Sequence, residues 1–240
     1  FIERLRNPQR TTETVEQYHQ LPKSAQAKLK DIGGFVGGSL INLQRKAINV
    51  TGRDLITLDL DAIEPGQTDN VVRTVDSLGM AYVIYSTRSH TPHRPRLRVV
   101  IPTDRTMTPD EYEPIARKVA SLIGIGMMDS TTFEASRLMY WPGCSSDAQY
   151  VFRSADKPFL SADGILAEYP DWRDVASWPQ VPGSETSVRV KQLLTKQQDP
   201  FTKHGIVGAF CRQYGIREAI DTFLPHAYSY VDGSHDRLTY

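Results

Sequence analysis

Hydrophobic and polar residues follow regular periods through the middle of the chain. Residues 54–60 (DLITLDL) alternate between the two classes and are rich in strand formers. Residues 81–86 (AYVIYS) and 96–101 (RLRVVI) have the composition of two further strands. Between the first two segments, residues 68–78 carry valine and leucine at helical spacing, and Gly79 follows as a stop signal. The pattern predicts a strand, a helix and two more strands in succession.

A second helix is predicted after the third strand. Thr108 and Glu111 have the spacing of a capping box, and apolar residues then recur on one helical face to about Ile123. Residues 137–141 and 149–152 are expected to be short strands. The order strand, helix, strand, strand, helix, strand is that of the split βαβ fold. We therefore expect an α+β domain with an RNA-recognition-motif-like core.

The two flanks of this core are less regular. Residues 11–31 look helical and polar, Gly33 and Gly34 follow as a stop signal, and residues 34–40 resemble a short glycine-rich strand. Residues 154–187 lack periodicity and are expected to form an irregular cover and linker. We therefore predict one domain over residues 1–180 and a small helical module over residues 187–240, with helices at 187–195 and 203–224.

The composition is that of a soluble globular protein. The chain has 240 residues, 40% hydrophobic and 23% charged, and its 28 basic and 28 acidic residues give a formal net charge of +0. Charge on the whole chain therefore gives no reason to expect a nucleic-acid partner, and only a local basic patch could do so. Cys144 and Cys211 form no CxxC pair, which excludes a Cys-rich zinc finger and fits a reducing cytosol. Because the sequence has no long apolar run, we expect a cytoplasmic protein with no membrane contact.

Three acidic residues are candidate metal ligands. Strand periodicity places Asp59 and Asp61 on one face, and Asp129 follows the second predicted helix. Paired carboxylates at this spacing suit Mg²⁺ or Mn²⁺. Three carboxylates could hold the two metal ions, about 4 Å apart, that phosphoryl transfer to a hydroxyl uses. The alternative is that these acids only cap turns and loops.

A basic segment joins the second and third predicted strands. Residues 86–98 contain four arginines and two histidines, and no acid occurs between Tyr85 and Asp104. Arg96 and Arg98 share one strand face. Guanidinium, imidazole and hydroxyl groups bind phosphate oxygens, so the segment is a candidate triphosphate clamp. The alternatives are a solvated basic hairpin, a structural histidine, or a zinc site on the two histidines that lacks a nearby third ligand.

Other residues near these motifs have two interpretations each. Arg45, Lys46 and Arg53 precede the first acidic strand and could contact template phosphates, or they could form a solvated face. Tyr140 and Trp141 could stack on a base or a sugar, although core packing is the expected role for at least one of them.

The combination of motifs resembles the archaeo-eukaryotic primase superfamily. Residues 57–61 resemble its hhhDhD motif, residues 88–90 (RSH) its SxH motif and residues 128–129 (MD) its hD motif. Residues 85–102 and 129–142 look like the phage and prophage branch, in which the primase domain often precedes a virulence-associated-E-type helicase. This resemblance implies an RNA-recognition-like primase–polymerase core with an N-terminal αβ unit.

The resemblance also implies roles for individual residues. Asp59, Asp61 and Asp129 would be catalytic metal ligands for Mg²⁺ or Mn²⁺. The second motif could use Ser86 or Ser89 and His90 or His93, and Ser89 with His90 is the preferred assignment. The implied nucleotide-binding residues are Arg88, Ser89, His90, Arg96, Arg98 and Arg137.

The sequence thus predicts a template-dependent nucleotidyltransferase, a DNA primase or polymerase of phage or mobile-element replication. Its expected partners are a single-stranded DNA template, nucleoside triphosphates and a replicative helicase, fused or separate. One alternative is a replication-initiator nicking endonuclease, which would need paired histidines around one hydrophobic residue and a nucleophilic tyrosine. A second alternative is an inert single-strand-binding module.

Overall fold

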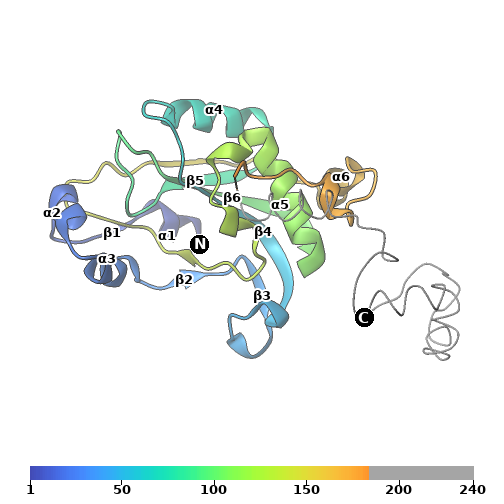
Figure 1. The fold of residues 1–240 in the computed structure, drawn as a ribbon, viewed down its shortest axis with the longest axis horizontal. Coiled ribbons are helices and arrows are strands. Elements are labelled where there is room, and N and C mark those ends of the chain that lie inside the picture. Colours follow the sequence, from blue (N-terminus) through green and yellow to red (C-terminus); the bar gives the residue numbers. More distant parts are fainter. Residues whose placement is uncertain (184–240) are drawn as a thin grey trace, which may run out of the picture. The chain divides into compact units, whose positions relative to one another are not determined.

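A computed structural model of the chain describes residues 1–183 (Figure 1). The predicted helices at 187–195 and 203–224, and the module that they were expected to form, lie outside the described residues. Among the described residues, no helix has the length and apolar character needed to cross a membrane.

A five-stranded sheet forms the centre of the described fold (Figure 1). All neighbouring strands are antiparallel, and β4 and β6, the two longest, lie side by side. Their spatial order is β3-β4-β6-β5-β9. In chain order the strands are β3 (Gly38–Leu40), β4 (Val50–Leu60), β5 (Tyr82–Ser86), β6 (Leu97–Met107) and β9 (Phe152–Ala155).

The predicted succession of the first five core elements is present. After β4 come α4 (Thr68–Ser77), β5, β6 and α5 (Pro109–Ile123). Because β4 and β5 are both antiparallel to β6, they run in the same direction with β6 between them. The position of the last strand differs from that in a split βαβ fold, where it would lie beside β4. Here β9 lies beside β5, at the opposite edge of the sheet. The edge beside β4 is taken by β3, which precedes it in the chain.

One face of the sheet packs against α4 and α5. Strand alternation turns Ile56, Leu58 and Leu60 toward these helices, and all three are fully buried. The predicted capping box of α5 is present, with the Thr108 hydroxyl accepting from Glu111 N and the Glu111 carboxylate accepting from Thr108 N. The core of the described fold therefore lies between this helical layer and the sheet.

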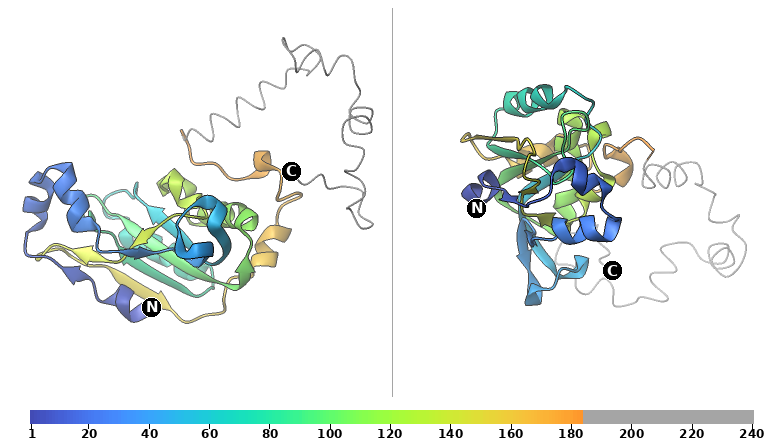
Figure 2. Two further views of the ribbon diagram at one scale, coloured as in Figure 1. Left: turned by 90° about the horizontal axis from the view of Figure 1, so that it is seen from below. Right: turned by 90° about the vertical axis from the view of Figure 1, so that its left-hand side faces the viewer.

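The N-terminal segment covers part of the opposite face (Figure 2). It was expected to carry one helix over residues 11–31, but two form, separated at Leu21 and Pro22, because proline disfavours a helical conformation in the residue before it. The predicted strand 34–40 is likewise two strands in different sheets. The elements of this segment are α1 (Ile2–Arg6), β1 (Gln9–Arg10), α2 (Val15–Gln20), α3 (Lys23–Lys30) and β2 (Gly34–Phe35).

Two short ladders fasten the N-terminal segment to the chain after α5. β1 pairs in parallel with β8 (Gly143–Cys144), and β2 pairs antiparallel with β7 (Met139–Tyr140). The predicted strand at 137–141 is thereby confirmed as a shorter strand, but it belongs to this ladder and not to the central sheet. The region after β9 was expected to be irregular, yet it contains α6 (Ala162–Ala167), which packs on α5.

Candidate active site

The C-terminal end of β4 brings the three predicted carboxylates to one face. Leu60 and Met128 form an antiparallel bridge, and Asp129 N donates to Asp59 O at 2.9 Å. Residues opposite each other in an antiparallel pair point to the same side, and alternation along β4 adds Asp61. Leu60 and Met128 point the other way, into the core. We call Asp59, Asp61 and Asp129 the carboxylate face.

Asp59 is held by an arginine on the neighbouring strand. Asp59 and Arg98 are paired in the register of β4 and β6. The Arg98 guanidinium donates to both carboxylate oxygens of Asp59, at 2.7 to 3.0 Å. Burial alone would lower the pKa of Arg98, but the Asp59 carboxylate outweighs it and raises that pKa. Arg98 therefore stays charged in a position that is only 4% exposed.

Asp61 is the most accessible of the three carboxylates. Its Oδ2 accepts from Arg96 Nη1 at 2.8 Å, and the side chains of Asp61 and Arg96 are 36% and 22% exposed. Burial raises the pKa of the Asp61 carboxyl, Arg96 opposes this, and the nearby Asp59 and Asp129 charges raise it further. Asp59 and Asp129 are thus close enough to act electrostatically on Asp61.

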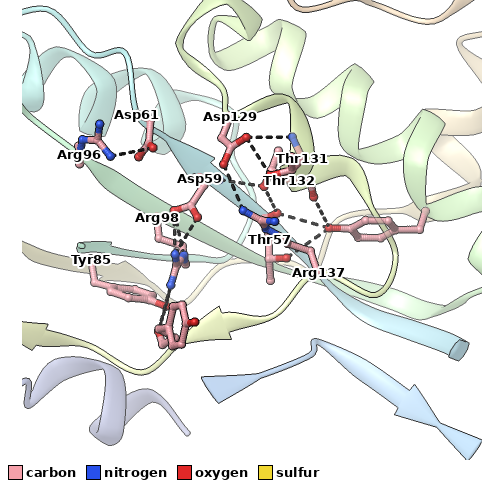
Figure 3. Close-up of polar contacts among 12 residues, drawn as sticks. Thr57, Asp59, Asp61, Tyr85, Arg96, Arg98, Asp129, Thr131, Thr132 and Arg137 are labelled. Atoms are coloured by element: carbon pink, nitrogen blue, oxygen red, sulfur yellow. Dashed lines mark hydrogen bonds and ion pairs between the residues drawn. The ribbon is translucent and has the colours of Figure 1, made fainter. Parts of the chain in front are cut away.

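Asp129 occupies the N-cap of a short 3₁₀ helix over Ser130–Phe133. Its Oδ1 accepts from Thr131 N at 2.9 Å and from Thr131 Oγ1 at 2.8 Å. Its Oδ2 accepts from Arg137 Nη2 at 3.3 Å. Capping was the alternative role weighed for this residue, and Asp129 does cap while it also contributes to the carboxylate face. Figure 3 shows each of the three carboxylates with its arginine.

A buried hydrogen-bond network holds the backbone of β4 at the carboxylate face. Asp59 N donates to Thr132 Oγ1 at 2.9 Å, and Thr132 Oγ1 donates to Thr57 O at the same distance. The Tyr112 hydroxyl of α5 lies 3.2 Å from Thr57 Oγ1. Arg53, weighed as a template ligand, is fully buried in this network and donates to Thr57 Oγ1 at 3.0 Å. Its role in the described fold is structural.

His90 and Ser89 lie in the turn between β5 and β6. His90 is buried, which lowers its pKa, and its Nδ1 accepts from Arg96 N at 3.0 Å. A neutral imidazole whose Nδ1 accepts carries its proton on Nε2, so Nε2 is a hydrogen-bond donor. Ser89 is half-buried, whereas the other serine that was considered, Ser86, is buried and accepts from Val151 N.

The remaining predicted side chains divide into two groups. Arg96, Arg98 and Arg137 meet the carboxylate face, as described above. Arg88 instead points to the N-terminal segment, where its buried guanidinium is hydrogen-bonded to Thr11 and Glu13. His93 is exposed on the turn. The structure therefore brings His90, and not His93, into the folded interior.

A polar pocket of about 170 Å³ opens beside the carboxylate face. Cations predominate among its charged side chains, and Lys30 Nζ also lies 5.4 Å from the Tyr140 ring. Sequence analysis did not single out Lys30, because nothing in a short polar helix signals that its last turn will reach β4. The lining residues are Lys30, Arg45, Asp59, Arg98, Arg137, Leu138 and Tyr140.

Within residues 1–183, no three histidine, cysteine, aspartate or glutamate side chains are arranged to hold a metal ion as they stand. The conformation described is one in which arginines neutralise the carboxylates. The donor set itself consists of hard carboxylate oxygens, which suit Mg²⁺ or Mn²⁺. Asp61 Oδ1 forms no hydrogen bond with other described residues. A cation bound here would therefore have to share or displace the arginine contacts.

Residues 1–181 match the family described as the VapE N-terminal domain. The chain belongs to this family. Membership confirms the relationship to virulence-associated-E-type proteins that the motifs indicated. No curated protein matches the chain. A solved structure, the AEP domain (PP-N190) of the cyanophage S-2L primase-polymerase (PrimPol), aligns over 62% of this chain and 78% of that one, with 14% identity and a TM-score of 0.43. A likeness at this level establishes no shared activity.

The family match spans every residue of the carboxylate face in this VapE N-terminal domain, together with α1 to α3. The N-terminal helices and the carboxylate face thus belong to one family domain. Lys30, on α3, is the clearest case, because it lines the pocket beside Asp59 although 29 positions separate the two residues.

Proposed function

We propose that this VapE N-terminal domain is a template-dependent nucleotidyltransferase that synthesises or extends strands on single-stranded DNA. The observation that carries the proposal is the register at the end of β4, which gathers Asp59, Asp61 and Asp129 on one face. Arg96 just before β6, Arg98 on β6 and Arg137 in the chain after α5 border that face. Juxtaposed carboxylates and guanidinium groups suit a triphosphate with its divalent cation.

The carboxylate face would hold the metal ions. When bound, Mg²⁺ or Mn²⁺ would activate the attacking hydroxyl oxygen and neutralise the negative charge of the triphosphate. Asp61 is the best placed first ligand, because it is the most exposed of the three and one of its oxygens has no hydrogen bond within the described residues. Asp59 would remain anchored by Arg98, which fixes the position of the face within the sheet.

When a nucleotide binds, the more accessible arginines would exchange their carboxylate partners for its phosphate groups. Arg96 and Arg137 are 22% and 32% exposed, and each forms a single short-range contact to its carboxylate. Arg96 Nε is buried without a hydrogen-bond partner in the described residues. His90 would add its Nε2 proton as a donor to a phosphate oxygen. Rate acceleration would come from positioning and charge neutralisation, with no covalent enzyme intermediate.

The proposed partners follow from this chemistry. Nucleoside triphosphates would enter beside the carboxylate face, where the pocket of about 170 Å³ contains Lys30 and Arg137. Single-stranded DNA would serve as the template. A replicative helicase, on the same chain or a separate one, would supply that strand in a host-cell cytoplasm during phage or mobile-element replication.

The experiment is a gel assay on single-stranded DNA, with and without a primer, with ribo- or deoxynucleotides and with Mg²⁺ or Mn²⁺. Asp61→Asn and Asp129→Asn are the most informative variants. Asparagine removes the carboxylate charge, and at position 129 it can still cap the 3₁₀ helix. Asp59 is a poorer choice, since its removal would leave Arg98 buried without its partner. Each variant should lower nucleotide incorporation by a factor on the order of 10² or more.

Asp54→Asn is the matched control. Asp54 lies on the same strand but is exposed, and among the described residues its carboxylate accepts only from Thr106 Oγ1. Its replacement should leave incorporation unchanged. Full activity of Asp61→Asn together with Asp129→Asn would refute the proposal. Of the two alternatives, a nicking endonuclease would form a covalent protein–DNA adduct, and an inert binding module would bind DNA without incorporating nucleotide.

A further inference from the structure

The loop between β3 and β4 exposes large aliphatic side chains. We call residues 41–49 (INLQRKAIN) the hairpin tip; it lies at the lower end of the described fold in Figure 1. Leu43 is 92% exposed, Ile48 is 87% exposed and Ile41 is 50% exposed. Single exposed aliphatic residues are common on protein surfaces, but three within nine positions indicate a contact surface.

The tip is held in shape by its own hydrogen bonds. Asn49 Nδ2 donates to Gln44 O at 3.1 Å, and Asn49 N donates to Lys46 O at 3.0 Å. Leu43 has a φ of 54°, in the left-handed region that a leucine rarely adopts. The tip therefore presents an aliphatic side chain to solvent from a backbone conformation that disfavours it, which the packing of the described fold does not explain.

The charge of the tip is positive. Arg45 and Lys46 are exposed, and neither forms an ion pair with another described residue. No acidic residue occurs between Asp31 and Asp54. In a chain with no net charge, such a stretch favours an anionic partner.

The tip also adjoins the carboxylate face. Arg45 lines the same pocket as Asp59, Arg98 and Arg137. A polyanion whose end lies over the carboxylate face would therefore pass close to the tip. This position links the surface to the substrate of the proposed reaction rather than to an unrelated partner.

We propose that the hairpin tip binds the minor groove and flanking phosphates of a nucleic-acid duplex, the template–primer stem next to the carboxylate face. Proteins that hold single strands stack bases on aromatic side chains, and the tip has none. Aliphatic wedges flanked by cations are instead typical of minor-groove contacts. Leu43 and Ile48 contact the groove, and Arg45 and Lys46 contact the phosphates. The inference rests on the proposed function for its choice of nucleic acid.

The test measures binding of the full chain to fluorescent DNA by anisotropy, without nucleotide or divalent metal. A duplex with a 5′ overhang is compared with the single strand alone over a series of salt concentrations. Arg45→Gln with Lys46→Gln should weaken duplex binding about tenfold and reduce the magnitude of the salt slope by about 1.8, the value for two lost phosphate contacts. Single-strand binding should change less than duplex binding.

The apolar half of the tip is tested separately. Leu43→Asn with Ile48→Asn should weaken duplex binding about fivefold with an unchanged salt slope, because only apolar contact is lost. Asparagine is chosen because it tolerates the left-handed conformation at position 43. The matched control is Arg73→Gln with Arg153→Gln, two exposed arginines on α4 and on β9, at the sheet edge opposite β3. The control should bind the duplex as the unmodified chain does.

Two results would overturn the inference. One is duplex binding that stays within twofold in both tip variants when their thermal unfolding matches that of the unmodified chain. The other is an equal loss for duplex and single strand, which would assign the tip to single-stranded template. If the unmodified chain binds the duplex through the tip but incorporates no nucleotide, only the proposed function is refuted. Metal-dependent incorporation with tip-independent duplex binding would refute only this inference.

Discussion

Arg98 and Asp59 form a two-oxygen ion pair in the interior of the sheet. The contacts are 2.7 to 3.0 Å long, and the two side chains are 4% and 12% exposed. Arg98 also donates to Tyr140 O and to the Tyr85 hydroxyl. The pair thus connects β4, β5, β6 and β7 at the position where the carboxylate face begins, and it sets the place of Asp59 before any ligand binds.

Arg98→Met should destabilise the fold strongly. The substitution leaves the Asp59 carboxylate buried without its partner, which costs about 3–5 kcal/mol of the free energy of unfolding. Urea denaturation at neutral pH measures it. Adding Asp59→Leu to Arg98→Met should recover most of the loss, since neither charge of the pair then remains buried. Arg6→Met, which removes an exposed ion pair with Glu3, should cost about 0–1 kcal/mol. A similar small loss for Arg98→Met would contradict the interpretation.

Thr132→Val should impair the site through the backbone of Asp59. The valine keeps the shape of threonine but leaves Asp59 N and Thr57 O without their hydrogen bonds to Thr132 Oγ1. We expect a loss of about 1–3 kcal/mol in the free energy of unfolding and lower nucleotide incorporation. Thr132→Ser keeps the hydroxyl and should retain activity. If valine and serine gave the same activity, Thr132 would have no positioning role.

Glu111→Gln should reduce stability only above acidic pH. The Arg105 side chain is the main cause that lowers the pKa of the Glu111 carboxyl below its usual 4.5. A lowered native pKa contributes stability that is present above the unfolded value and is lost as pH falls through the native value. The difference between the two proteins should be no more than about 1 kcal/mol at pH 7 and should vanish in acid. A difference that grows as pH falls would contradict this assignment.

His90→Asn separates two functions of the imidazole. The amide oxygen can replace Nδ1 as acceptor for Arg96 N, while the Nε2 donor is lost. Thermal stability should therefore be largely kept, while affinity for a nucleoside triphosphate falls about tenfold, the loss expected for one hydrogen bond to a charged group. His93→Asn, on the exposed turn, is the control and should bind normally. Unchanged nucleotide affinity in His90→Asn would remove His90 from the proposed clamp.

The sequence best predicted the helices and strands that bury one face, because that burial sets a regular spacing of their apolar residues. The helix Pro109–Ile123 was predicted with its bounds, because its capping box and apolar face both point to the same residues. The position of the last strand was missed, because which edge of a sheet a short strand joins depends on contacts far away in the chain. β3, a three-residue strand, takes the edge beside β4 through a close approach of two glycine backbones.

The candidate site was predictable only in part for the same reason. Alternation along β4 was enough to place Asp59 and Asp61 on one face, and the antiparallel bridge between Leu60 and Met128 adds Asp129. The direction of Arg88 was not predictable, because its partner Glu13 lies 75 positions away. The pairing of Asp59 with Arg98 and of Asp61 with Arg96 also depends on the register between β4 and β6, which no local pattern specifies.

A divalent cation shared by the carboxylate face and a nucleotide underlies the proposed mechanism. The most direct measurement is the affinity for a non-hydrolysable fluorescent nucleoside triphosphate with Mn²⁺ and with chelator. The unmodified chain and Asp54→Asn should bind at least about tenfold more tightly with Mn²⁺. Asp61→Asn combined with Asp129→Asn should lose that gain while unfolding at a similar temperature. A full Mn²⁺-dependent gain in the double variant would contradict the account.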